Sequence, residues 1–514
     1  MTHQDQKIIT SFQRRLEMDS ALRSLGETTS EFALRRLAQE IVEKYGDDIV
    51  GPLISLLDTS NPQLRGGLGH VATLVDRSKI VPALRSTAYN RSLSDQARIA
   101  AITILERFLG VEPDPDMYVG MSAPEEIALH SLREALGEAR SDPLVLVEYL
   151  EQLAQEPPDV LLTMVRAATR LEGADGVEML RLFAQDPFQP AAEEAIQALG
   201  SRSEPEAVQA LEVLALHLPP GLRRQAERSL QKLRLRGVPA PARRAPPADA
   251  RCLATAPDAQ GRQLLWFVLP NRQSDDYTLL SLLISDRRGV TQATADLHAA
   301  AKALPPPQAI GHLLAWSPAE QPIGPLLEAP FDYGRRQVAQ AVERNWQAER
   351  PLPLVYRVVN PLLWTWSAPK PAELPEPASP PDPRLGRLLQ HLSLFNRWFL
   401  LTPEIYTVAQ EFMAAQEALD PRAVDQAMTA LVQRLAGDAA LQTTLSARLL
   451  ALREWLAVAQ DTAAADEAWL AAQTLVRAPL EQPVLAHLCL LGLRVAMINI
   501  ARGLSWEQVA ELLE

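Results

Sequence analysis

Apolar and polar residues follow a helical period through the first 236 residues, and the pattern recurs along the chain. The segments 61–75 and 94–110 show it most clearly. Each opens with a residue that commonly caps a helix, Asn61 or Ser94, and each places an arginine, Arg65 or Arg98, after one apolar position. Counted from such an anchor, the residue seven positions later is always apolar, so these residues should face a continuous core. The anchors recur every 30 to 33 residues, at positions 35, 65, 98, 129, 161, 192 and 223.

A second helical stretch lies between most anchors, for example at 46–57, 142–155 and 176–185. Two helices in about thirty residues predict a helical hairpin, and stacked hairpins form a solenoid. The Asn-Pro start, the arginine after an apolar residue and the A-x-x-x-L-G ending resemble HEAT-repeat α-solenoid proteins of the bacterial type. The resemblance covers residues 1–236 only, and it implies a scaffold or adaptor. One departure is the segment 110–123, which has no room for a first helix.

After the solenoid the apolar period changes from helical to strand-like. Residues 251–295 are short apolar runs separated by Asp, Gly, Asn and Pro, which predicts a four-stranded antiparallel meander beginning near Arg251. The second and third runs are apolar on both faces, so we expect both faces to be covered. A helix should follow from Asp332, whose side chain suits the N-cap position.

Residues 384–514 return to long amphipathic helices and predict a helical bundle. The apolar run 484–500 contains His487 and Arg494 and is shorter than the roughly 20 residues that span a bilayer, so we interpret it as a buried bundle helix. At the end of the chain, Ser505 and Gln508 have the spacing of a capping box.

The predicted fold is therefore mainly α, with a small α+β part in the middle. Five segments make up the expected organisation: a HEAT-like solenoid (1–236), a Pro/Arg-rich linker (237–250), a β-meander with helices (251–366), a Pro-rich linker (367–383) and a C-terminal helical domain (384–514).

Composition narrows the function classes. The net charge of −13 is unfavourable for a general nucleic-acid binder, and residues 402–514 carry 14 acidic side chains against 7 arginines. The two cysteines, Cys252 and Cys489, are far apart, which predicts neither a disulfide framework nor a zinc site. The polar N-terminus lacks the apolar core of a signal peptide, so we expect a cytoplasmic protein without membrane association.

Motifs for catalysis or cofactor binding are weak. Gly67, Gly69 and Ala72 fit a dinucleotide-binding pattern, but they lie inside a predicted helix, where Gly66, Gly67 and Gly69 are better explained by close helix packing. The pair Asp296 and His298, with His312 beyond, is a poor metal site. We therefore expect no cofactor, no metal and no catalytic residues.

Candidate partner-binding residues lie in two places. The segment 223–251 has nine basic residues against two acidic ones, among them Arg223, Arg224, Arg243 and Arg244. The arginines near Leu230, Leu233 and Leu235 should end the last solenoid helix and cover apolar surface there, which leaves open whether Arg243 and Arg244 contact an acidic surface of this chain or of a partner.

Trp364 and Trp366, together with Tyr356, either form a binding surface or close a domain interface. The preferred function is a non-catalytic protein-interaction scaffold with a protein partner. The alternatives are a nucleic-acid-binding solenoid that uses the basic segment 223–251, or an accessory to an enzyme, as in lyase-like HEAT proteins.

Overall fold

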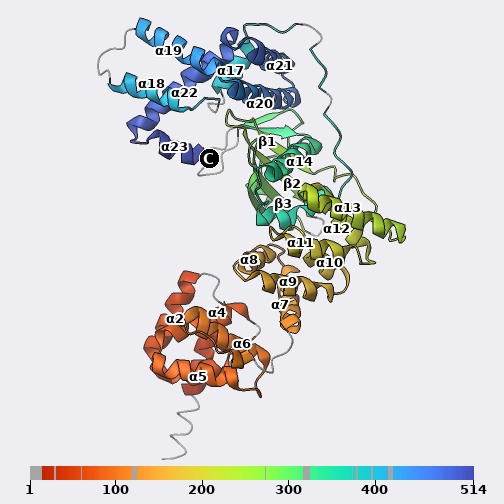
Figure 1. Ribbon diagram of the computed structural model, residues 1–514, viewed down its shortest axis with the longest axis vertical. Coiled ribbons are helices and arrows are strands. Elements are labelled where there is room, and N and C mark those ends of the chain that lie inside the picture. The colour runs from red at the N-terminus through yellow and green to blue at the C-terminus, as the bar shows by residue number, and fades with distance from the viewer. Residues whose placement is uncertain are drawn as a thin grey trace, which may run out of the picture. The chain divides into compact units, whose positions relative to one another are not determined.

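The structure is a computed structural model that describes residues 14–27, 31–59, 61–118, 124–271, 274–315, 325–372, 374–377, 380–394, 398–414 and 421–513. Within these ranges the chain is mainly α-helical, with a six-stranded antiparallel sheet in the middle (Figure 1). The predicted fold class is confirmed. Contacts divide the chain into two compact units, Met1–Gly137 (unit 1) and Glu138–Glu514 (unit 2).

Unit 1 contains short helices in two rows. In the first row, α2 packs on α4 and α4 packs on η3, while α3 and α5 pack together in the second row. The helix ends follow the sequence signals, because the Asn61 side chain accepts the Leu64 N–H at 3.1 Å and the Ser94 hydroxyl oxygen accepts the Ala97 N–H at 3.1 Å. The elements are η1 (Ser24–Glu27), α2 (Glu31–Tyr45), η2 (Gly46–Ile49), α3 (Val50–Ser55), α4 (Pro62–Leu74), α5 (Arg77–Tyr89), α6 (Asp95–Thr103), η3 (Ile104–Phe108), η4 (Pro115–Tyr118) and α7 (Pro124–Ala139).

Unit 2 opens with regular helical hairpins. Here α9 packs on α11, α11 on α13 and α10 on α12, so each helix contacts the equivalent helix of the next hairpin, as stacked repeats require. The helices are α8 (Val145–Leu153), α9 (Pro158–Thr169), α10 (Gly173–Phe183), α11 (Gln189–Leu199), α12 (Pro205–His217) and α13 (Pro220–Leu235).

The predicted row of apolar residues does face the core. Six of its seven members are buried, and Val42 is half-buried against the core of unit 1. The segment after Gly110 contains only the 3-10 turn η4 in its described part, which agrees with the missing helix. That turn still packs on the array, because Met117 is buried and its carbonyl accepts a hydrogen bond from Arg98. The six buried members are Ala72, Leu105, Leu136, Ala168, Leu199 and Leu230.

The sheet contains the four predicted strands and two that the sequence pattern did not reveal. Its strand order is β4-β3-β2-β1-β6-β5, with β6 antiparallel to β1, for example Leu253 opposite Glu328. The sequence pattern does not predict the two additional strands, because one has only three residues and the other begins with proline. The strands are β1 (Arg251–Thr255), β2 (Arg262–Pro270), β3 (Tyr277–Ser285), β4 (Gly289–Ala299), β5 (Leu313–Ala315) and β6 (Pro325–Ala329).

Helix α14 (Phe331–Gln347) packs on this sheet. Gly334 permits the close approach, since a Cβ atom there would lie 2.4 Å from the Cys252 sulfur. The expected burial of β2 is confirmed, whereas β3 is only partly covered, with Leu279 and Leu283 half-buried. The expected N-cap at Asp332 is wrong: the helix begins at Phe331 after Pro330, and the Asp332 carboxylate instead accepts a hydrogen bond from Arg335 at 3.0 Å.

The C-terminal helices dock on the sheet within unit 2 (Figure 1). The indole of Trp455 on α20 donates to the Ala254 carbonyl of β1 at 3.2 Å, and Arg448 forms an ion pair with Asp286 at 2.7 Å. The predicted capping box is present, because the Gln508 side chain accepts the Ser505 N–H at 2.9 Å. The helices are α17 (Gly386–Leu394), α18 (Pro403–Ala414), α19 (Pro421–Ala436), α20 (Ala439–Val458), α21 (Thr462–Arg477), α22 (Pro483–Ala501) and α23 (Trp506–Leu513).

Helix α22 alone among the described helices is long and apolar enough to cross a membrane, judged by length and composition. In the structure it packs against α18 and α19, and Gly492 lets it approach the backbone at Leu400, whose oxygen would lie 1.8 Å from an added Cβ atom. Leu488 and Cys489 are buried, while Leu490 and Ile498 are exposed. The helix therefore takes part in the predicted bundle.

Both proline-rich segments lie against the protein. The Arg243 guanidinium contacts the Glu212 carboxylate at 2.7 Å, and the Ser367 N–H donates to the Arg244 carbonyl at 2.9 Å, which joins the two segments to each other. Leu230 and Leu233 are buried at the end of α13, as expected for its last turns. Leu235, however, is 82% exposed, so the expectation that the arginine stems cover this surface is wrong at that residue.

Candidate functional site

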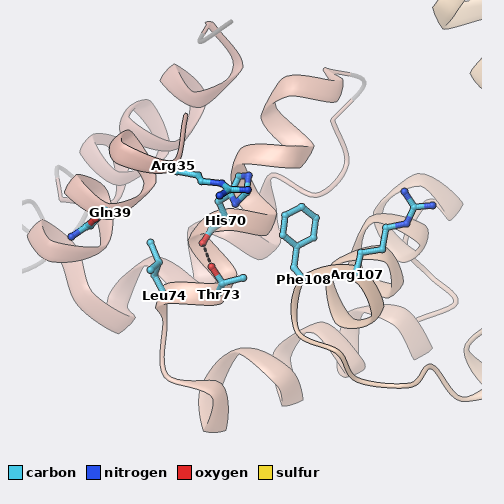
Figure 2. A pocket seen from close by; sticks show the side chains of 7 residues that line it. All are labelled: Arg35, Gln39, His70, Thr73, Leu74, Arg107 and Phe108. Atoms are coloured by element: carbon cyan, nitrogen blue, oxygen red, sulfur yellow. Dashed lines mark hydrogen bonds between the residues drawn. The ribbon is translucent and has the colours of Figure 1, made fainter. Parts of the chain in front are cut away.

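A basic pocket of about 640 Å³ in unit 1 is the main candidate for a binding site. It is formed by α2, α4 and η3, which are neighbours in the first row of helices. In Figure 2 the Arg35 side chain points toward His70, and the Phe108 ring stands between His70 and Arg107. The lining residues are Arg35, Gln39, His70, Thr73, Leu74, Arg107 and Phe108.

The local backbone explains how Phe108 reaches the pocket. Helix α6 continues into a π-helical turn, in which the Leu109 N–H donates to the Ile104 carbonyl at 3.1 Å. Such turns insert an extra residue into the helical repeat and often occur at functional sites. The turn places the Phe108 ring edge-on to His70, with 5.3 Å between the ring centroids.

The glycines of α4 have the packing role that the sequence predicts, with one exception. A Cβ atom at Gly69 would lie 2.5 Å from the Phe108 ring, and one at Gly67 would lie 2.7 Å from Leu25. Gly66 has no neighbour within 4 Å, so the prediction is wrong there. The dinucleotide-like pattern of Gly67 and Gly69 is thus a pattern of helix packing.

Arg35 is a repeat anchor in the sequence pattern, but that pattern does not reveal the pocket. The available signal was the glycine pair, which indicated that something large packs on α4. It could not identify Phe108, because the partner lies 39 positions later and its direction depends on the π turn.

The basic residues proposed from the sequence lie in unit 2, and most of those with described contacts face carboxylates of this chain. Arg223 pairs with Glu343 at 2.7 Å, and Arg243 shares Glu212 with Arg234. Arg224 and Arg244 are exposed. Arg251 forms a two-pronged contact with Glu328, at 2.6 and 2.9 Å, inside the sheet. Arg243 therefore contacts an acidic residue of this same protein and not of a partner.

The tryptophans proposed from the sequence lie at the junction between the helical repeats and the middle domain. Trp364 is buried, and its indole N–H donates to the Tyr356 hydroxyl at 3.0 Å. That hydroxyl donates to His217 Nε2 at 2.9 Å, and His217 Nδ1 lies 2.6 Å from the Val213 carbonyl. Because a carbonyl only accepts, Nδ1 carries the proton. Trp366 is half-buried and donates to the Leu362 carbonyl, a contact within its own segment.

Burial holds His217 in its neutral form. Burial lowers the pKa of His217 to about 4, and the positive charges of Arg181 and Arg223 act in the same direction. All three polar groups of the hydrogen-bond chain have partners, so their role is to join α12 to the segment that contains α15 (Leu354–Val359) and α16 (Pro361–Trp364). Of the two alternatives for the tryptophans, this placement favours the interface.

Two buried arginines strengthen the same junction. Arg181 of α10 donates to the carbonyls of Arg357 and Val358 at 2.7 and 3.0 Å, near the end of α15. In return, Arg357 donates to the Gln185 carbonyl just after α10 at 2.9 Å. Each guanidinium thus satisfies carbonyls at the C-terminal end of the other helix, where the helix dipole favours a cation.

The weak metal motif does not assemble in the described residues. His298 contacts Asp276 at 2.7 Å, and no group of three or more metal-ligating side chains occurs in the ranges that the structure describes. Both cysteines are buried and unpaired, and burial raises the pKa of the Cys489 thiol to about 12. Thiols in this state are poor nucleophiles.

Comparison with known proteins identifies the repeat. The family model of HEAT repeats matches residues 143–231, less than a fifth of the chain, which correspond to α8–α13. No curated protein and no solved structure matches. The N-terminal half of the chain therefore carries HEAT-like solenoid repeats, with the family match placed on residues 143–231.

Proposed function

We propose that this protein is a non-catalytic scaffold or adaptor whose HEAT-like helices bind a protein partner. HEAT repeats are in general protein-interaction elements, because stacked hairpins expose a long surface that one partner can follow. The observation that carries the proposal is the basic pocket of unit 1, where three neighbouring helical elements present cationic, polar and apolar side chains together. This mixture suits the side chains of another protein.

The internal ion pairs of unit 2 support a protein partner over a nucleic acid. Several cations of the basic segment 223–251 already face carboxylates of this chain, such as Glu343 and Glu212. A cation paired in this way contributes less to phosphate binding. We also propose a cytoplasmic location, which agrees with two buried, reduced cysteines.

Affinity capture of the tagged full chain from its native cell, with identification of bound proteins and nucleic acids, tests the proposal. We expect a protein that also binds the purified chain as an isolated pair. If no protein is enriched over an untagged control, the scaffold function is wrong. A complex with nucleic acid that weakens steeply with salt in a gel-shift assay would favour the nucleic-acid alternative.

A further inference from the structure

We infer that the basic pocket of unit 1 binds a short acidic segment of the partner protein that carries an apolar side chain between its carboxylates. The inference rests on the proposed scaffold function and names the chemistry of the partner. It concerns the pocket formed by α2, α4 and η3, which no family match covers.

The polar lining selects for an anion. Arg35 and Arg107 contribute guanidinium groups, His70 an imidazole and Gln39 an amide, and none of the described residues that line the pocket is acidic. A guanidinium presents a planar fork of N–H donors that matches a carboxylate. Since the two arginines come from different helices, they can bind two separate carboxylates of one segment.

The apolar lining selects for a side chain between those carboxylates. Leu74 is 47% exposed at the end of α4, and the half-buried Phe108 also lines the pocket. A pocket of about 640 Å³ lies within the roughly 300–1,000 Å³ that ligand sites usually enclose, and it has room for a leucine or phenylalanine side chain with its neighbours. Covering Leu74 and Phe108 removes apolar surface from water, which stabilises the complex.

The pocket is preformed. Gly69 lets the Phe108 ring lie against α4, and the edge-on contact with His70 fixes the orientation of both rings. The hydroxyl of Thr73 donates to the His70 carbonyl at 2.7 Å, which holds the last turn of α4. A binding site that is ordered in advance has less conformational entropy to lose when a partner binds.

A nucleic acid fits this pocket less well than a short acidic peptide. Residues 1–137 carry 15 lysines and arginines against 19 aspartates and glutamates, and Glu40, Glu43 and Glu106 are exposed on the same elements as the pocket residues. A continuous polyanion would have to pass these carboxylates, which repel phosphate. A segment with two carboxylates can place them on Arg35 and Arg107 alone.

Fluorescence anisotropy with the full chain tests this inference. The probe is a labelled short peptide with glutamates on both sides of a Leu-Phe pair. We expect saturable binding that weakens with salt, and about a tenfold loss in affinity for Arg35→Glu or Arg107→Glu, because each removes one charge-assisted contact. The matched control is Arg36→Glu, which makes the same charge change one residue further along α2, at a side chain that is 73% exposed and pairs with Glu40.

Four results would contradict the inference. Equal binding of a peptide with glutamines in place of glutamates, or equal loss in Arg36→Glu, would overturn it. Tighter binding of a single-stranded oligonucleotide of equal charge would assign the pocket to nucleic acid. A dimer of the chain alone that dissociates in Arg35→Glu would assign it to a second copy.

The captured partner separates this inference from the function on which it rests. If that protein binds the wild type and the double variant Arg35→Glu/Arg107→Glu equally well, the pocket assignment is wrong and the scaffold function stands. If no protein binds the full chain, the scaffold function is wrong, whatever the peptide does. Thermal melting of each variant confirms that unit 1 remains folded.

Discussion

The two units use the same kind of helical repeat in different ways. In unit 2 the buried polar side chains of the repeats, Arg181 and His217, connect them to the middle domain. In unit 1 the buried arginine, Arg98, donates to the Ala88 and Met117 carbonyls of its own array, while Arg35 and Arg107 line an open pocket. The repeats of unit 2 thus support a neighbouring domain, whereas those of unit 1 leave a pocket open at their surface.

The largest expected effect is the loss of the arginine exchange in unit 2. Arg181→Met removes a buried guanidinium that donates to the Val358 carbonyl and to the Asn360 side-chain oxygen, and it leaves the Arg357 carbonyl only the longer hydrogen bond from Gln185. We expect the free energy of unfolding of unit 2 to fall by about 3–5 kcal/mol, since breaking one side of a buried polar network is costly. Chemical denaturation followed by tryptophan fluorescence measures it.

The control for that variant is Arg166→Met. Arg166 lies in the same run of repeats but is 54% exposed and pairs with Glu194 on the surface, so little change is expected. Equal destabilisation by the two variants would contradict the idea that the buried junction distinguishes unit 2.

The second effect is a loss of stability in acid that depends on His217. Its pKa is about 4 in the folded protein and about 6.5 when unfolded, so the unfolded state binds the proton first as the pH falls. Unit 2 should therefore lose stability between pH 6.5 and pH 4, by about 3 kcal/mol from this group. Denaturation curves measured across this range should show that the free energy of unfolding changes less with pH in His217→Gln than in the wild type. An unchanged pH dependence in that variant would show that His217 does not control the junction.

The third effect comes from the hydroxyl at the centre of the hydrogen-bond chain. Tyr356→Phe leaves the Trp364 N–H and His217 Nε2 without partners, and we expect a loss of about 1–3 kcal/mol in unit 2. Tyr89→Phe removes an exposed hydroxyl of unit 1 that contacts Asp114, and it should cause no measurable change. Thermal melts of the two variants compare the two regions directly. If the melting temperature fell by a similar amount in both variants, the buried hydroxyl of Tyr356 would matter no more for stability than the exposed hydroxyl of Tyr89.

The smallest effect concerns the proline-rich segment that follows α13. Arg243→Ala breaks the contact with Glu212, which still pairs with Arg234, so the stability of unit 2 should change by less than about 1 kcal/mol. The segment 238–250 should nevertheless become more sensitive to limited proteolysis, because a contact that holds it to the repeats is lost. Unchanged cleavage would mean that the Arg244–Ser367 backbone contact alone is sufficient.

Sequence periodicity predicted the elements whose signals are local. The caps at Asn61 and Ser94, the apolar row of the repeats and the first four strands could be read directly, because each depends on neighbouring residues or on a fixed period. Strands β5 and β6 could not, because a three-residue strand and one that begins with proline become strands only by pairing with a sheet that already exists. The start of α14 was misplaced by two residues, because the N-cap is Pro330 and not Asp332. An aspartate near a helix start can accept from several donors, and the Asp332 carboxylate accepts from Arg335 and from the Lys370 N–H instead.

The sequence by itself determined that this protein has HEAT-like repeats, a central antiparallel sheet and a helical C-terminal part. Tertiary structure decided what the charged and aromatic residues do. Arg243 and Trp364 were candidates for partner binding, but the fold directs one to Glu212 and buries the other beside Tyr356. The pocket of unit 1 became visible only when Arg35, His70 and Phe108 came together from three elements. Local patterns specify helices and strands, whereas the partner of a long polar side chain depends on contacts between segments that are far apart in sequence.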